Sequence, residues 1–196
     1  LAMGEALMGH FTQAQIDASP KLLESYIYIE QSEGKDDDAY NRLKSLFEAK
    51  KLPNSLSGNL LLLAATRGDS KLANEVIQDV PMTTMQDTQV LSLIEIAINQ
   101  RDPALLAHIS ANYRGEENEK QHPLVAAALA IANRSDRADA LLTQLDSLGF
   151  SHEQTLRIAH ICAHYKRTDC TDRLLGKLPE QDKLTDVEVA TVGDIY

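Results

Sequence analysis

The sequence has no tryptophan, only two cysteines, and few aromatic residues, which make up 5% of its 196 positions. Two cysteines are too few for a small secreted fold held by several disulfides. No run approaches the roughly 18 apolar residues of a membrane-spanning helix. Sustained alternation of apolar and polar residues and the dipeptides of tight β-hairpins are also missing. These absences favour an all-α protein without membrane spans.

The charge is one-sided, because 29 acidic residues face 19 basic ones and leave a net charge of −10. A negative field repels phosphate, so coating of nucleic acid and binding to anionic membranes both become less expected. Hydrophobic residues at 43% and charged residues at 24% are ordinary for a globular domain. We expect one domain over residues 1–196, in the cytoplasm or an organelle interior rather than secreted.

Motifs that carry chemistry are also missing: we find no glycine-rich phosphate loop, no GxSxG elbow and no paired carboxylates. His160 and His164 are four residues apart on an expected helix and could both face one ion. Ile161 stands where a metalloprotease would place its glutamate, and no third ligand is evident. We therefore predict no catalytic residues, no metal and no cofactor, and a protein that is not an enzyme.

A repeat organises the rest of the chain. The segments AATRGD, AINQRD, IANRSD and YKRTD end at Asp69, Asp102, Asp136 and Asp169. These aspartates recur at a regular period of about 33 to 34 residues, the length of a helical-hairpin repeat. One further step back reaches Asp36. An apolar helical run precedes each aspartate and an amphipathic run follows it, as in a helix-turn-helix unit.

This period predicts a right-handed α-solenoid of about five repeats of 33–34 residues, with ten to twelve helices in all. The repeats are expected at about 20–52, 53–85, 86–118, 119–150 and 151–180. Residues 181–196 are expected to form a C-terminal cap or tail, with a short helix from about Asp186. The charged stretch Arg114–Pro123 interrupts the pattern on the surface.

The five aspartates are expected to be N-caps, because a carboxylate there accepts a backbone N–H from the first turn. Pro103 after Asp102 fits the first helical position. Ser151 with Gln154 has capping-box spacing. Of the two cysteines, Cys162 is predicted in the core and Cys170 as an exposed thiol in a first helical turn.

The Gly68-Asp69 turn, with Ala73 four residues after the aspartate, resembles the tetratricopeptide and pentatricopeptide families of helical-hairpin repeats, and Ala140 after Asp136 repeats the feature. The segment Leu46–Ile77 looks especially like a pentatricopeptide unit. The first family implies a protein or peptide ligand in a concave groove, and the second implies single-stranded RNA. An ankyrin array shares the period but lacks its TPLH turn here, and stays a minor alternative.

Base-reading positions of a pentatricopeptide array would fall on Asn59, Ser92, Ala126 and Ala159, and two alanines offer a base no hydrogen bond. We therefore expect a scaffold or adaptor for a partner protein, with RNA binding or a place as accessory subunit of a larger complex as alternatives. Self-association through exposed repeat ends is also open.

Two sets of residues are the candidate contacts. The first is an arginine column at the turns, which recurs with the same period as the aspartates and could grip carboxylates or phosphates or simply complement helix ends. It consists of Arg67, Arg101, Arg134 and Arg167. The second is the polar residues of the first helices: Asn59, Ser92, Glu95, Asn99, Asn133, Arg157, His160 and His164.

Overall fold

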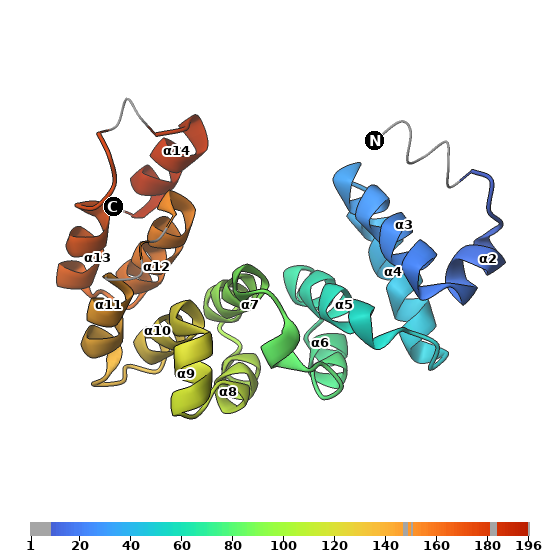
Figure 1. The fold of residues 1–196 in the computed structure, drawn as a ribbon, viewed down its shortest axis with the longest axis horizontal. Coiled ribbons are helices and arrows are strands. Elements are labelled where there is room, and N and C mark those ends of the chain that lie inside the picture. Colours follow the sequence, from blue (N-terminus) through green and yellow to red (C-terminus); the bar gives the residue numbers. More distant parts are fainter. Residues whose placement is uncertain (1–8, 147–148, 150, 181–183, 196) are drawn as a thin grey trace. The chain divides into compact units, whose positions relative to one another are not determined.

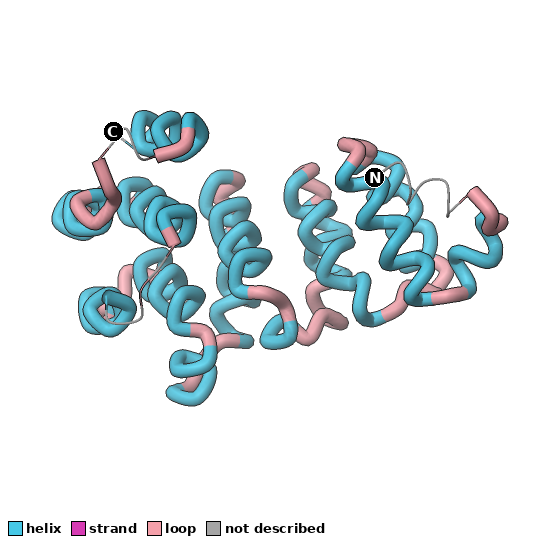
Figure 2. Tube along the Cα trace, turned by 45° about the horizontal axis from the view of Figure 1, so that its top comes forward, coloured by secondary structure: helices cyan, strands magenta, loops and turns pink. Residues whose placement is uncertain are grey.

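The computed structural model describes residues 9–146, 149, 151–180 and 184–195. This part of the chain forms thirteen α-helices, labelled α2 to α14, with one 3-10 helix, and it contains no β-strand (Figure 1, Figure 2). The all-α fold class is thereby confirmed for the described residues. There are more helices than predicted, since two short segments, Gln13–Ala18 and Glu116–Gln121, are helical. The end of the fourth predicted repeat, at 147–148 and 150, lies outside this part.

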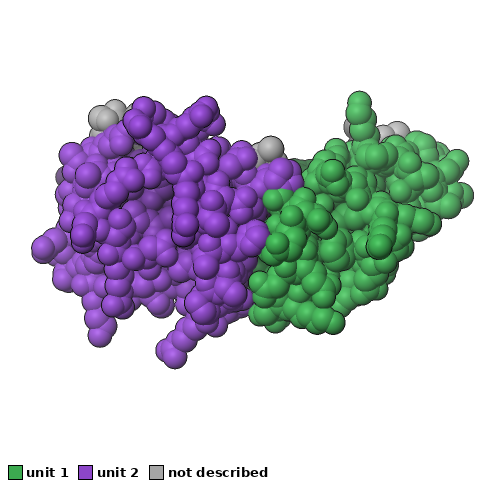
Figure 3. Space-filling model, turned by 90° about the horizontal axis from the view of Figure 1, so that it is seen from below, with its two compact units in different colours: residues 1–80 green, residues 81–196 purple. Residues whose placement is uncertain are grey.

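The chain divides into two compact units, residues 1–80 and 81–196 (Figure 3). The first contains α2 (Gln13–Ala18), α3 (Pro20–Ser32), α4 (Asp36–Glu48), α5 (Asn54–Thr66) and α6 (Ser70–Val76). The second contains η1 (Met82–Thr84), α7 (Asp87–Asn99), α8 (Pro103–Asn112), α9 (Glu116–Gln121), α10 (Pro123–Ala132), α11 (Ala138–Asp146), α12 (His152–His164), α13 (Thr168–Leu175) and α14 (Asp186–Ile195). A single repeat domain stays a prediction.

Successive helices pack as hairpins within each unit. In unit 1 these are α3 with α4 and α5 with α6. Unit 2 pairs α7 with α8, α10 with α11, and α12 with α13. One such hairpin falls in each of the five predicted repeat ranges. The apolar periodicity therefore located the helix pairs, while their assembly into a solenoid stays a prediction.

The turn between the two helices of each hairpin has the same backbone geometry every time. One residue adopts a positive φ of 53° to 72°, and the next residue donates its backbone N–H to a carbonyl five positions back, at 2.8–3.0 Å. This is a Schellman motif, in which a left-handed residue ends the helix. The left-handed residues are Gly34, Gly68, Arg101, Arg134 and Lys166.

This motif corrects the role predicted for the aspartates. The residue after the left-handed one can cap the second helix, and in two hairpins it is an aspartate: Asp69 accepts the N–H of Leu72, and Asp102 accepts those of Ala104 and Leu105. Asp36 and Asp169 instead lie inside the first turns of α4 and α13. Asp136 lies in the turn before α11 and is exposed. The predicted column is one or two residues out of register there.

Replacing Asp102 by alanine should lower the free energy of unfolding by about 1 kcal/mol, because two N–H groups of α8 lose their acceptor. Asp136→Ala is the matched control, since its side chain makes no capping bond among the described residues. Chemical denaturation of both variants checks this. Equal losses in the two variants would contradict the assignment of Asp102 as a cap and Asp136 as a plain turn residue.

Unit 2 is built around α10, an alanine-rich helix that begins with Pro123 at its first position. Its other nine residues, Leu124 to Ala132, are all buried. Helices α7, α9, α11 and α12 all pack against it. Small side chains let these neighbours approach closely, so α10 is the core of the unit.

The C-terminal cap predicted from about Asp186 is present as α14, which packs on α12. Thr185 and Glu188 form its capping box, with the Glu188 carboxylate accepting the Thr185 N–H at 2.7 Å. The pKa of the Glu188 carboxyl is lowered by this backbone bond and by the Thr185 hydroxyl. The capping box predicted for Ser151 and Gln154 is also present.

The prediction of an exposed Cys170 thiol is wrong. Cys170 is 5% exposed, Cys162 is fully buried, and the two form a disulfide with their Cα atoms 6.1 Å apart. The bond joins the last turn of α12 to the first turn of α13, so it closes one hairpin covalently. Two cysteines are too few for a disulfide framework, but they are enough to cross-link the two helices of a single hairpin.

Replacing both cysteines by serine should lower the free energy of unfolding by about 2 to 3 kcal/mol, because the short cross-linked loop no longer restricts the unfolded chain. Denaturation with and without dithiothreitol measures this. Reductant should destabilise the natural protein and leave the double variant unchanged. A natural protein insensitive to reductant would show that the bond does not form in solution.

Candidate functional site

Three of the predicted contact residues meet in unit 2, but they bind one another. Arg157 of α12 donates to both carboxylate oxygens of Glu95 in α7, at 3.1 and 2.6 Å. It also donates to the Ser92 hydroxyl at 2.8 Å and to the Thr88 carbonyl at 3.1 Å. We call this set of four residues the Arg157 network. These bonds all reach acceptors on α7, which fixes α12 against that helix.

The Arg157 network explains how two helices that are far apart in the sequence come to contact each other. The side chains of Arg157 and Glu95 are only 15% and 21% exposed, so their charges are poorly hydrated and depend on the bidentate bond. Both helices also pack on α10. Ser92, Glu95 and Arg157 were predicted to contact a partner in a groove. In the structure they instead hold α7 and α12 together.

Arg157→Ala should lower the free energy of unfolding by about 2 to 3 kcal/mol, because the mostly buried Glu95 is left without its cation. Glu95→Ala in the same background should add little further loss. A double-mutant cycle by urea denaturation measures this coupling. Arg173→Ala, an exposed residue of α13, is the control, and strictly additive losses for Arg157 and Glu95 would contradict the network.

The arginine column divides into two pairs. The end members hold carboxylates of the preceding hairpin: Arg67 contacts Asp37 at 2.6 Å, and Arg167 contacts Asp139 at 2.7 Å. Arg67 also lies over the ring of Tyr40, 4.8 Å from its centre. These two arginines connect neighbouring hairpins inside each unit, which accounts for their presence without a ligand.

The middle members, Arg101 and Arg134, occupy left-handed positions in their turns. Neither makes an ion pair with a described residue. Arg134 lies 6.0 Å from the ring centre of Tyr165. Arg101 lines a pocket of about 300 Å³ with Tyr165 and His164. We call these four residues the Tyr165 cluster; it brings together three predicted contact residues, with their cations available to a ligand.

The remaining predicted residues do not converge. Asn59 of α5 donates to Gln31 of α3 at 3.5 Å. Asn99 is exposed at the end of α7, and His160 is partly exposed on α12.

The two histidines are not joined by a further ligand, and no group of three metal-binding side chains occurs in the described ranges. No helix there is long and apolar enough to cross a membrane.

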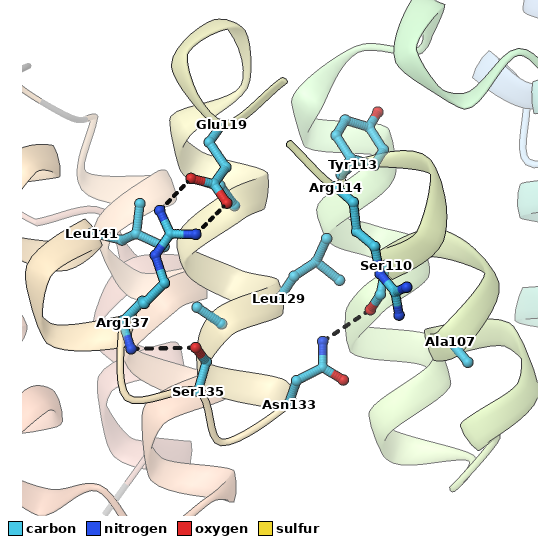
Figure 4. A pocket seen from close by; sticks show the side chains of 12 residues that line it. Ala107, Ser110, Tyr113, Arg114, Glu119, Leu129, Asn133, Ser135, Arg137 and Leu141 are labelled. Atoms are coloured by element: carbon cyan, nitrogen blue, oxygen red, sulfur yellow. Dashed lines mark hydrogen bonds and ion pairs between the residues drawn. The ribbon is translucent and has the colours of Figure 1, made fainter. Parts of the chain in front are cut away.

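A second pocket of unit 2 was not predicted. It lies among α8, α9, α10 and α11 and has a volume of about 440 Å³ (Figure 4). Arg137 binds Glu119 of α9 through both guanidinium nitrogens, at 2.9 and 2.6 Å, along one side. Asn133 donates to the Ser110 hydroxyl at 2.9 Å on the other. We call this the α9 pocket, since the charged interruption Arg114–Pro123 supplies its end wall.

Unit 1 holds its own buried polar cluster. Glu30 of α3 is 5% exposed and contacts Arg42 of α4 at 3.5 Å, while Arg42 also contacts Asp17 at 3.4 Å and lies over the ring of Tyr26. Burial raises the pKa of the Glu30 carboxyl, and the charge of Arg42 opposes that rise. The cluster ties α2, α3 and α4 together.

Comparison with known proteins adds no family: no family model, no curated protein and no solved structure matches this chain.

Proposed function

We propose that the chain is a non-enzymatic helical-repeat scaffold of the tetratricopeptide and pentatricopeptide type, which binds a partner protein or peptide. The observation that carries the proposal is the Tyr165 cluster: the guanidinium of Arg134 lies 6.0 Å from the ring centre of Tyr165, and Arg101 lines a pocket with that ring. Neither arginine has a carboxylate partner among the described residues. Guanidinium groups bind carboxylates bidentately, and aromatic side chains are common in protein interfaces. The hairpins and their shared turn geometry support a right-handed solenoid as the architecture.

The proposed contact surface lies at the turns between helices and not in a concave groove lined by the first helices. Ser92, Glu95 and Arg157 serve the Arg157 network, so the proposed contacts are the turn residues Arg101 and Arg134. His164 joins them through the pocket it lines. A partner would therefore approach unit 2 at the ends of its helices.

Protein is favoured over RNA for two reasons. The net charge of −10 opposes a polyanion. Among the expected base-reading positions, Ala126 and Ala159 are 7% and 0% exposed, and the Ser92 hydroxyl accepts a bond from Arg157. An alanine side chain has no group that can hydrogen-bond to a base edge.

The compartment is a proposal as well. Disulfides form and persist where conditions are oxidising. The Cys162–Cys170 bond therefore favours an oxidising compartment over the cytoplasm.

The proposal is tested by immobilising the protein and exposing it to lysate from its own source, with and without ribonuclease. We expect a defined set of retained proteins that survives ribonuclease. The double variant Arg101→Glu/Arg134→Glu should lose that set at an unchanged melting temperature, because neither arginine is ion-paired within the described chain.

Arg173→Glu is the matched control, since it reverses an exposed charge on α13 away from the Tyr165 cluster. Retention of RNA, with loss of all proteins on ribonuclease treatment, would replace this proposal by the pentatricopeptide one. Equal retention by the double variant would remove the Tyr165 cluster from the interface.

A further inference from the structure

The α9 pocket has an apolar floor and one available cation. Ala126, Leu129 and Ala130 of α10 form the floor with Leu141 of α11, and all four are buried. Figure 4 shows Leu129 between the two sides, with Arg137 and Glu119 on one and Arg114 beside Ser110 on the other. A ligand there would bury an aliphatic group against α10 while its polar atoms meet the rim.

The charges of the rim are unequal. Arg137 is neutralised by its bidentate bond to Glu119. Arg114 is exposed, and within the described ranges no carboxylate pairs with its guanidinium. The side chains that line the pocket therefore carry a net charge of about +1, in a protein whose net charge is −10. A local cation over an apolar floor favours an anionic group at that position.

The hydrogen-bonding groups of the rim add a second requirement. The Ser110 hydroxyl is satisfied, because it donates to the Leu106 carbonyl at 2.8 Å and accepts from Asn133. The side-chain carbonyl of Asn133 has no donor among the described residues and can accept a peptide N–H. Arg114 supplies donors to an acid, and Asn133 supplies an acceptor to a backbone.

We propose that the α9 pocket binds a peptide segment carrying one carboxylate next to a small aliphatic side chain, with Arg114 holding the carboxylate and Asn133 a backbone N–H. The proposal rests on the proposed function, since the segment would belong to the partner protein. The volume of about 440 Å³ accommodates a few side chains. A polyanion is disfavoured, because further negative charges would meet the acidic protein without a second available cation among the described residues of this pocket.

The probe is acetyl-Leu-Ala-Glu-Ala-Leu-amide, titrated into the full-length ¹⁵N-labelled protein and followed by amide chemical shifts. We expect saturable shifts at Ser110, Arg114 and Asn133, and at least tenfold weaker binding of the same peptide with Gln in place of Glu. Arg114→Gln should lose the same factor for the Glu peptide and nothing for the Gln peptide. Arg173→Gln, outside the pocket, should bind as the natural protein does.

Equal binding of the Glu and Gln peptides would overturn the proposal, as would saturable shifts confined to the Tyr165 cluster or produced only by a short oligonucleotide. Proteins retained from lysate by both the natural protein and Arg114→Gln, without peptide shifts at the pocket, would leave the scaffold proposal standing and refute this site. Peptide binding at the pocket without any retained protein would leave this site standing and refute the scaffold proposal.

Discussion

The whole chain depends on one backbone conformation, the left-handed residue that ends the first helix of every hairpin. It lets the next residue bond back to the first helix while the second helix begins at once, so each hairpin closes through a very short turn. Glycine adopts this conformation without strain at Gly34 and Gly68, whereas Arg101, Arg134 and Lys166 adopt it at a cost of about 1 kcal/mol each. Packing of the hairpins offsets that strain, and in unit 2 it places cations at the tips of the turns.

Burial of α10 decides which surfaces of unit 2 can serve a ligand. Nine consecutive buried residues leave this helix no exposed stripe, and the Arg157 network holds α7 and α12 together beside it. The side chains of Ser92, Glu95 and Arg157 on these first helices are therefore used for stability. The polar groups of unit 2 that remain available to a ligand lie at the turns, in the Tyr165 cluster, and beside the inserted helix α9. Both are places where the regular pattern changes: arginine replaces glycine in one, and a charged stretch is inserted in the other.

The sequence predicted the helix pairs well, because apolar residues at helical spacing report which face of a helix is buried, and this information is local. It misplaced the caps of α11 and α13, because the pattern followed aspartates, whereas the turn is defined by a positive φ that arginine and lysine at positions 134 and 166 do not predict. The cap of α4 was misplaced by the same reliance on aspartates, although Gly34 marks that turn. Contact between Glu95 and Arg157 depends on how hairpins stack, so no local spacing encodes it. Cys170 was predicted exposed for a different reason: its bond to Cys162 lies within one hairpin, but it depends on how α13 folds back on α12. The unpaired Arg114, by contrast, lay within a charged interruption visible in the sequence.

Net charge and local charge act at different ranges in this protein, and the difference bears on what it can bind. At physiological ionic strength the Debye length is about 8 Å, so a ligand in contact with Arg101 or Arg114 experiences that cation more strongly than the acidic residues elsewhere. A long polyanion has no such advantage, since each further phosphate adds repulsion from the net charge of −10. Under the proposed function, isolated cations in an acidic surface would select for ligands whose carboxylates are few and spaced apart, a pattern that protein segments can supply and nucleic acid cannot.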